Sequence, residues 1–251
     1  MEDVVEALKD QQGELSALLE RLDEDGWAQP SPCEGWDVAD VVLHLCQTNE
    51  MALASAEQRL GAWYDTATAG APPADNVDDA AASFVAAERG RPIPELHARW
   101  QQGADSLLAA LAAGDPHLRV EWVVGQLSLR TLATTRLAET WIHTGDVAIA
   151  LDQPIAPTAR LEHIARLAWR TLPYAFTRAG RELHGPVAFL LDGAGGAAWH
   201  FVPEEPAVTT VRGDALDLCQ VAARRVDPAD TGLRAEGPDA EGVLELVRTY
   251  A

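Results

Sequence analysis

The sequence predicts an α+β protein in which an antiparallel four-helix bundle is followed by a smaller domain of helices and short strands. Two observations support this fold class. Up to about residue 151, apolar residues recur at intervals of three and four, which indicates amphipathic helices. Beyond about residue 155, short extended segments alternate with helical ones. We therefore expect a helical bundle over residues 1–154 and an α+β domain over residues 155–251.

Four principal helices account for the bundle. Helical spacing predicts them at residues 4–22, 38–63, 93–113 and 131–151, with a shorter helical segment at 80–88. Asp37 is suited to cap the second helix, because its carboxylate can accept a hydrogen bond from a free backbone N–H. Two short stretches, 120–124 and 127–129, are β-like, and the segment 66–79 lacks periodicity and is predicted to be a loop.

The C-terminal domain is predicted to mix helices and short strands. Helices are expected at residues 158–179, 215–225 and 240–250, and strands at 186–191, 197–202 and 207–211. Asp214 can cap the second of these helices. Four residues, GAGG at 193–196, favour a hairpin turn rather than a phosphate loop, since no Lys-Ser or Lys-Thr pair follows them.

Composition and charge exclude several classes of function. The formal charge of −20 opposes binding to a nucleic-acid backbone. No apolar stretch reaches the roughly 20 residues that cross a bilayer, and the acidic N-terminus differs from a basic signal peptide. Three cysteines without CxxC spacing favour reduced thiols. We expect a cytoplasmic protein without nucleic-acid or membrane partners, either a monomer or a homodimer.

A polar stripe runs along the predicted helix 131–151. Arg136, Glu139, His143 and Asp146 follow one another at steps of three, four and three, so they share one helix face. Apolar residues flank this stripe, at positions 132, 137, 141, 142 and 147. Much of the helix must therefore be buried, and an inward-facing glutamate and histidine are costly without partners. A metal ion is one such partner.

His44 is the third candidate ligand. Glu139 and His143 are spaced so that a carboxylate oxygen and an imidazole nitrogen can converge on one cation, and His44 lies in the apolar stripe of the second helix. Two histidines and one carboxylate leave coordination positions open, as catalytic sites do. The alternatives are a core histidine satisfied by hydrogen bonds and a surface ion pair between Glu139 and His143, and the spacing leaves both open.

Two segments carry a resemblance to a known family. SPCEGWDVADVVLHL, residues 31–45, and RLAETWIHTGDVAIAL, residues 136–151, resemble two signatures of the mycothiol-dependent maleylpyruvate isomerase family. In that family a DinB-like four-helix bundle binds a divalent metal, usually zinc, through residues that match His44, Glu139 and His143. The donor set would also accept Fe, Ni or Mn. Asp146 is expected either to orient a metal-bound histidine or to lie at the surface near the helix end.

The resemblance extends into the C-terminal domain. Residues 208–238 resemble the family's C-terminal domain, which is related to sterol-carrier folds. The resemblance implies an active-site arginine in this region, and Arg224 or Arg225 is nearest to the matching pattern. Here Ala223-Arg224-Arg225 stands where a Gly-Arg pair is more usual. The alternative role is that of a solvent-exposed arginine at a helix end.

The implied chemistry is thiol addition. The resemblance suggests mycothiol as a low-molecular-weight thiol cosubstrate, activated at the metal, that adds to a small electrophile. Addition and elimination give isomerisation, whereas addition alone or displacement gives an S-conjugate. Two rival functions are a non-catalytic small-molecule-binding protein with a structural metal and a thiol-independent metal hydrolase. Cys33 is not expected to be a nucleophile, because no His–Cys pairing is visible and the resemblance gives its loop a structural role.

Overall fold

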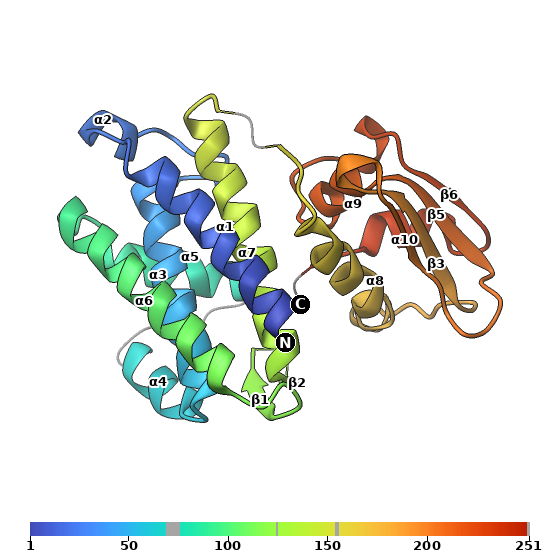
Figure 1. Ribbon diagram of the computed structural model, residues 1–251, viewed down its shortest axis with the longest axis horizontal. Coiled ribbons are helices and arrows are strands. Elements are labelled where there is room, and N and C mark those ends of the chain that lie inside the picture. The colour runs from blue at the N-terminus through green and yellow to red at the C-terminus, as the bar shows by residue number, and fades with distance from the viewer. Residues whose placement is uncertain (69–75, 124, 154–155, 250–251) are drawn as a thin grey trace. The chain divides into compact units, whose positions relative to one another are not determined.

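The computed structural model describes residues 1–68, 76–123, 125–153 and 156–249 (Figure 1). The chain divides into two compact units, Met1–Ile155 and Ala156–Ala251. Helices and two sheets are both present, so the predicted α+β class is confirmed. The domain boundary predicted between residues 154 and 155 lies outside the described residues.

Four long helices build the first unit. They are α1 (Glu2–Leu19), α3 (Val38–Ala56), α6 (Ile93–Ala113) and α7 (Leu129–Ala150). Helix α3 packs against α6 and α7, and α1 packs against the same two helices. Their apolar stripes meet in a core that includes Leu15, Leu45, Trp100 and Val147. Burial of these stripes is what holds the helices together, since isolated helices are marginally stable in water.

Shorter elements complete the first unit. They are α2 (Glu24–Trp27), α4 (Leu60–Ala67), α5 (Val77–Glu88) and the antiparallel hairpin of β1 (Arg119–Trp122) and β2 (Gly125–Ser128). Ser128 is the last residue of β2. It also caps α7, because its hydroxyl accepts a hydrogen bond from the Thr131 N–H at 3.1 Å. The start of α7 is thereby fixed to the end of the hairpin.

The single helix predicted over residues 38–63 is wrong. Gln58 adopts the left-handed conformation, with φ +58°, and separates α3 from α4. This conformation lets the Arg59 N–H donate to the Ala54 carbonyl oxygen at 2.8 Å, which satisfies the C-terminus of α3. Helical spacing continues across the break, so periodicity alone did not show it. Helices α4 and α5 also include both ends of the predicted loop 66–79, whose residues 69–75 lie outside the described part of the chain.

The second unit places helices on a four-stranded sheet. Helices α8 (Leu161–Arg178), α9 (Ala215–Ala222) and α10 (Ala240–Leu246) lie against the sheet, and Asp214 caps α9 as predicted (Figure 1). The strands run in the order β4-β3-β5-β6, with β3 and β5 parallel and the other pairs antiparallel. Their bounds are β3 (Val187–Asp192), β4 (Ala198–Phe201), β5 (Thr209–Asp214) and β6 (Arg234–Glu236).

Two details of the second unit bear on the predictions. A short 3-10 turn, Ala194–Gly196, connects β3 and β4, in agreement with the predicted hairpin turn at GAGG. Strand β6 was not predicted, because a segment of three residues is too short to show an alternation that periodicity could detect. Within the described residues, no helix combines the length and the apolar character needed to cross a membrane.

Candidate metal centre

The first unit brings His44, Glu139 and His143 together from facing helices. His44 lies on α3, whose N-terminus is fixed by a capping box: Asp37 accepts from the Asp40 N–H at 2.9 Å and Asp40 accepts from the Asp37 N–H at 3.4 Å. Glu139 and His143 lie one turn apart on α7, which packs against α3. Helix starts and helix packing together set the register that puts His44 opposite Glu139.

The three donor atoms lie close to one another. His44 Nε2 is 2.9 Å from Glu139 Oε1, and His143 Nε2 is 3.5 Å from the same oxygen. The two imidazole rings are 4.9 Å apart between centroids and nearly perpendicular. The histidine side chains are each 10% exposed, whereas that of Glu139 is 23% exposed, so the cluster reaches solvent on the Glu139 side.

The cluster fits a divalent cation. Metal bonds of about 2.0–2.1 Å in a tetrahedral arrangement place ligand atoms roughly 3.3 Å apart. The distances of 2.9 Å and 3.5 Å to Glu139 Oε1 lie on either side of that value, and all three donor atoms lie within 4.8 Å of one another. Two imidazoles and one carboxylate form a donor set for Zn, Fe or other first-row metals. Their role as ligands stays a prediction.

Hydrogen bonds dominate the electrostatics of the cluster. Burial favours the neutral form of Glu139, but hydrogen bonds with His143 and His44 outweigh it and hold its pKa well below the ordinary range. Burial likewise disfavours charged His143, yet hydrogen bonds with Asp146, Cys33 and Glu139 hold its pKa well above the ordinary range. The pKa of His44 is lowered by burial. Without a cation, these contacts favour the charged forms of Glu139 and His143 and the neutral form of His44.

Asp146 lies behind His143. Its Oδ2 accepts a hydrogen bond from His143 Nδ1 at 2.9 Å, and its side chain is 1% exposed. Burial is incompatible with the surface position that the sequence left open for Asp146. When the ring is neutral, the contact keeps its proton on Nδ1, and it leaves Nε2 facing Glu139. The assignment of Asp146 as an orienting residue remains a prediction that this geometry supports.

The structure places Cys33 beside His143 and Asp146, a neighbourhood that the sequence did not show. Cys33 Sγ lies 3.2 Å from Asp146 Oδ2, the same oxygen that His143 contacts. Sγ, a ring nitrogen of His143 and an Asp146 oxygen lie within 4.8 Å of one another. Cys33 and Asp146 are 113 positions apart, so no spacing in the sequence could show the contact. The one available signal was that Cys33 belongs to the same family-like segment as His44.

The loop that carries Cys33 is held by its own hydrogen bonds. The Ser31 hydroxyl donates to the Trp36 carbonyl oxygen at 2.9 Å and accepts from the Cys33 N–H at 3.1 Å. Gly35 adopts φ +74°, a conformation that favours glycine, so the chain can turn back. Trp36 then lies beside His44, with ring centroids 5.2 Å apart. Trp36 therefore packs against a candidate ligand.

Arg136 joins α7 to α3 one turn before Glu139. Its side chain is buried, and Nη2 donates to Thr48 Oγ1 at 2.9 Å and to Asn49 Oδ1 at 3.2 Å. Its Nε has no hydrogen-bond partner within the described residues. The positive charge of Arg136 helps to lower the pKa of Glu139 and of His44. Arg136, the first residue of the polar stripe, thus connects α7 to α3 beside the candidate ligands.

Arg224 and Arg225 lie in the second unit, directly after α9. Arg224 has φ +61°, and its guanidinium donates to the Glu245 carbonyl oxygen at 2.7 Å. Arg225 Nη1 donates to the Ala223 carbonyl oxygen at 3.1 Å. The catalytic role that the resemblance suggests for one of them stays a prediction.

Comparisons with known proteins agree with the two family-like segments. A family model described as the mycothiol maleylpyruvate isomerase N-terminal domain matches residues 8–148. Two Mycobacterium tuberculosis proteins, the uncharacterized proteins Rv0036c of strain H37Rv and MT0041 of strain CDC 1551, are each 33% identical over 247 residues. These matches cover 97% of this chain and 93% of each relative.

Solved structures show a similar fold. The crystal structure of the mycothiol-dependent maleylpyruvate isomerase matches with a TM-score of 0.62 and 17% identity, over 95% of both chains. A histidine-to-alanine mutant of that enzyme matches with a TM-score of 0.61 and 18% identity, over the same shares. At these identities the likeness demonstrates the fold alone.

Proposed function

Because this chain belongs to the mycothiol maleylpyruvate isomerase family, we propose that it is a metal-dependent enzyme that uses mycothiol to isomerise or conjugate a small electrophile. The observation that carries the proposal is the convergence of His44, Glu139 and His143 on one point with Glu139 open to solvent. Three protein ligands leave room for a further ligand, whereas structural metal sites close all positions.

A divalent cation held by these residues would lower the pKa of a coordinated thiol, so that a nucleophile forms at neutral pH without a strong protein base. Glu139 supplies the one negative charge among the three ligands, and the imidazoles are neutral when they ligate. Arg136 and Asp146 carry opposite charges close to the cluster. The loaded centre therefore keeps a net positive charge, which favours a thiolate and anionic electrophiles.

The addition step decides between isomerase and transferase. When a thiolate adds to a conjugated alkene, a C–S bond forms and the C=C bond becomes a single bond, which can rotate. Expulsion of the thiolate restores the alkene in the other configuration and returns the thiol. If elimination does not occur, a proton completes the adduct and the thiol is consumed. Consumption of mycothiol thus separates the two reactions.

The left-handed conformation of Arg224 refines the assignment of the second-unit arginine. A φ of +61° favours glycine, which supports matching Arg224 to the glycine of the family-like Gly-Arg pair and Arg225 to its arginine. We assign Arg225 as the residue that acts on the substrate. We expect Arg225→Ala to lower turnover without changing metal content, and Arg224→Ala to leave turnover close to that of the unaltered protein.

The test combines metal analysis with a screen of electrophiles, maleylpyruvate among them, in the presence of mycothiol. We expect about one divalent ion per chain and turnover that needs both the metal and mycothiol. His44→Ala and His143→Ala should lose both, whereas His117→Ala, which changes an exposed histidine, should lose neither.

Two results would contradict this function. Turnover by water alone, unaffected by any thiol, would identify a hydrolase. A metal-loaded protein that retains an apolar ligand and turns over no electrophile would identify a binding protein with a structural metal.

A further inference from the structure

The Cys33 thiol and the His143 ring share one acceptor. Cys33 Sγ is 3.2 Å and His143 Nδ1 is 2.9 Å from Asp146 Oδ2. Cys33 is half-buried, and Asp146 is almost fully buried. The thiol and the carboxylate lie on the Nδ1 side of the imidazole, away from the Nε2 that faces Glu139. The loop before α3 therefore reaches α7 directly behind a candidate metal ligand.

We propose that Cys33 is a positioning residue of the metal centre, whose S–H holds the Asp146 carboxylate where it accepts the Nδ1–H of His143. The inference rests on the proposed metal-dependent function. A carboxylate oxygen that accepts two hydrogen bonds is fixed in place, and the imidazole bonded to it presents Nε2 in one orientation. Groups that orient a ligand in this way typically change metal affinity about 10- to 100-fold when they are removed.

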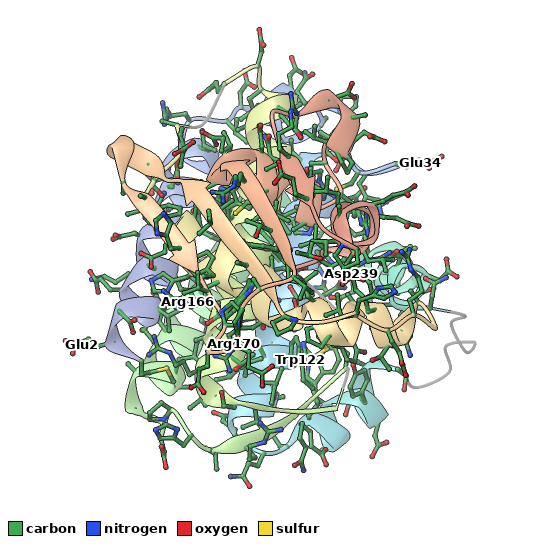
Figure 2. All side chains as sticks on the ribbon, turned by 90° about the vertical axis from the view of Figure 1, so that its right-hand side faces the viewer. Glu2, Glu34, Trp122, Arg166, Arg170 and Asp239 are labelled. Carbon is green, nitrogen blue, oxygen red and sulfur yellow. The ribbon has the colours of Figure 1, made fainter. Side chains whose placement is uncertain are left out.

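The loop is built to hold the thiol in place. In addition to the bonds of Ser31 within the loop, the Trp36 N–H donates to the Cys33 carbonyl oxygen at 3.0 Å. From outside the loop, Arg89 donates to the Gly35 carbonyl oxygen at 3.1 Å and to Asp40 Oδ1 at 2.9 Å. The neighbouring Glu34 extends outward from the molecule (Figure 2), whereas the Cys33 thiol contacts buried Asp146. The loop thus directs one side chain inward and the next to solvent.

Direct ligation by Cys33 is the alternative, since its sulfur, His143 Nδ1 and an Asp146 oxygen could also surround a cation. A metal at Nδ1 would break the 2.9 Å bond between His143 and Asp146 and would leave Glu139 and His44 without the ion. A metal bound at His143 Nε2 instead leaves the bonds of Cys33 and His143 to Asp146 intact. The geometry therefore favours positioning over ligation.

The test measures metal release rather than activity alone. Zinc-loaded protein is mixed with excess chelator, and the release rate is compared among variants. We expect Cys33→Ala to release zinc about 10- to 100-fold faster, Cys33→Ser, which keeps a donor, to be within a few-fold of the unaltered protein, and Cys219→Ala, which removes a thiol from the second unit, to show no change. Circular dichroism checks that each variant is folded.

A double-mutant cycle separates positioning from simple packing. If Cys33 acts through Asp146, then Cys33→Ala should have no further effect on zinc release in an Asp146→Asn background. Additive effects would overturn the proposal, as would an unchanged release rate in Cys33→Ala. Should Cys33→Ala not fold, Cys33→Val, which fills the space of the thiol without a donor, and Asp146→Asn give the same comparison.

Cobalt substitution provides the spectroscopic readout. A thiolate bound to Co²⁺ absorbs strongly in the near ultraviolet, so a band that disappears in Cys33→Ser would make Cys33 a ligand and overturn the positioning role. We expect no such band and weak visible bands of similar intensity in both proteins. If the unaltered protein binds neither zinc nor cobalt, the proposed function fails as well, which distinguishes that outcome from a failure of the inference alone.

Discussion

The two units differ in what they bury. In the first unit, α7 and α3 bury His44, Arg136, His143 and Asp146, which are ionisable. In the second unit the sheet buries Phe189, Phe201 and Val211 against its helices, and Asp239 is the buried charged residue among those described. Burying a charge costs several kcal/mol unless it is fully paired. The first unit therefore carries a stability cost that the second does not.

The buried carboxylate of the second unit has its hydrogen bonds satisfied, whereas a buried guanidinium of the first unit lacks one partner among the described residues. Both carboxylate oxygens of Asp239 accept hydrogen bonds from His184, at 2.7 Å from Nδ1 and 3.0 Å from the backbone N–H. Arg136 in the first unit keeps an unpartnered Nε among the described residues. Costly groups concentrated in one place indicate a functional site rather than a structural network. The comparison predicts that substitutions in the first unit change metal binding and those in the second change stability.

The largest expected effect concerns the apolar core of the second unit. Phe189→Ala removes a fully buried ring and should lower the free energy of unfolding by about 3–5 kcal/mol. Urea unfolding followed by circular dichroism measures it. Zinc affinity measured below the unfolding transition should not change, and a parallel loss of affinity would break the proposed division between the units.

The complementary change removes the charged ligand of the first unit. Glu139→Gln keeps the size of the side chain but removes its negative charge, so divalent metal affinity should fall by a factor on the order of 100 or more. Isothermal titration with zinc measures this loss. Asp239→Asn in the second unit is the matched control and should bind zinc as the unaltered protein does. Equal losses in the two variants would contradict the assignment of Glu139.

Metal affinity of the first unit should depend on pH, because His143 must lose a proton to bind a metal through Nε2. Its pKa is raised by hydrogen bonds with Asp146, Cys33 and Glu139. Metal affinity should therefore fall about tenfold for each pH unit below this raised pKa. Competition with a chelator from about pH 5 to 8 tests this slope. A flat profile would show that His143 does not exchange a proton for the metal.

The stability of the metal-free protein should change with pH in the direction opposite to metal affinity. Charged His143 stabilises the folded state, and this contribution is complete below the unfolded histidine pKa of about 6.5. It is lost as pH rises through the raised pKa of the folded state. The melting temperature of chelator-treated protein should thus decline above neutral pH, and this decline should be absent in His143→Gln.

The smallest expected effect lies at the end of α9. Arg224 holds a left-handed φ of +61°, so Arg224→Gly should relieve backbone strain of about 1 kcal/mol, less what is lost with the bond to the Glu245 carbonyl. Thermal unfolding should show a small increase in stability, and zinc affinity should be unchanged. A clear decrease in stability would mean that the bond to Glu245 outweighs the strain.

The main helices of the bundle and their candidate ligands could be read from local patterns. Helical spacing depends on residues three and four apart, so it identified the segment that became α7 and placed Glu139 and His143 on one face. It also placed His44 on the apolar face of the segment that became α3. The break at Gln58 escaped notice because a left-handed residue other than glycine leaves no mark on periodicity.

Tertiary structure decided what surrounds those ligands. Cys33 meets Asp146 across 113 positions, and Arg136 meets Thr48 and Asn49 across 88 and 87. Such contacts depend on helix packing and on a loop closed by its own hydrogen bonds, neither of which is encoded in the spacing of nearby residues. The sequence alone determined the four main helices of the bundle, apart from the break at Gln58, and the donor types, because both are local properties. The packing of α3 on α7 decided which donors meet and which groups orient them.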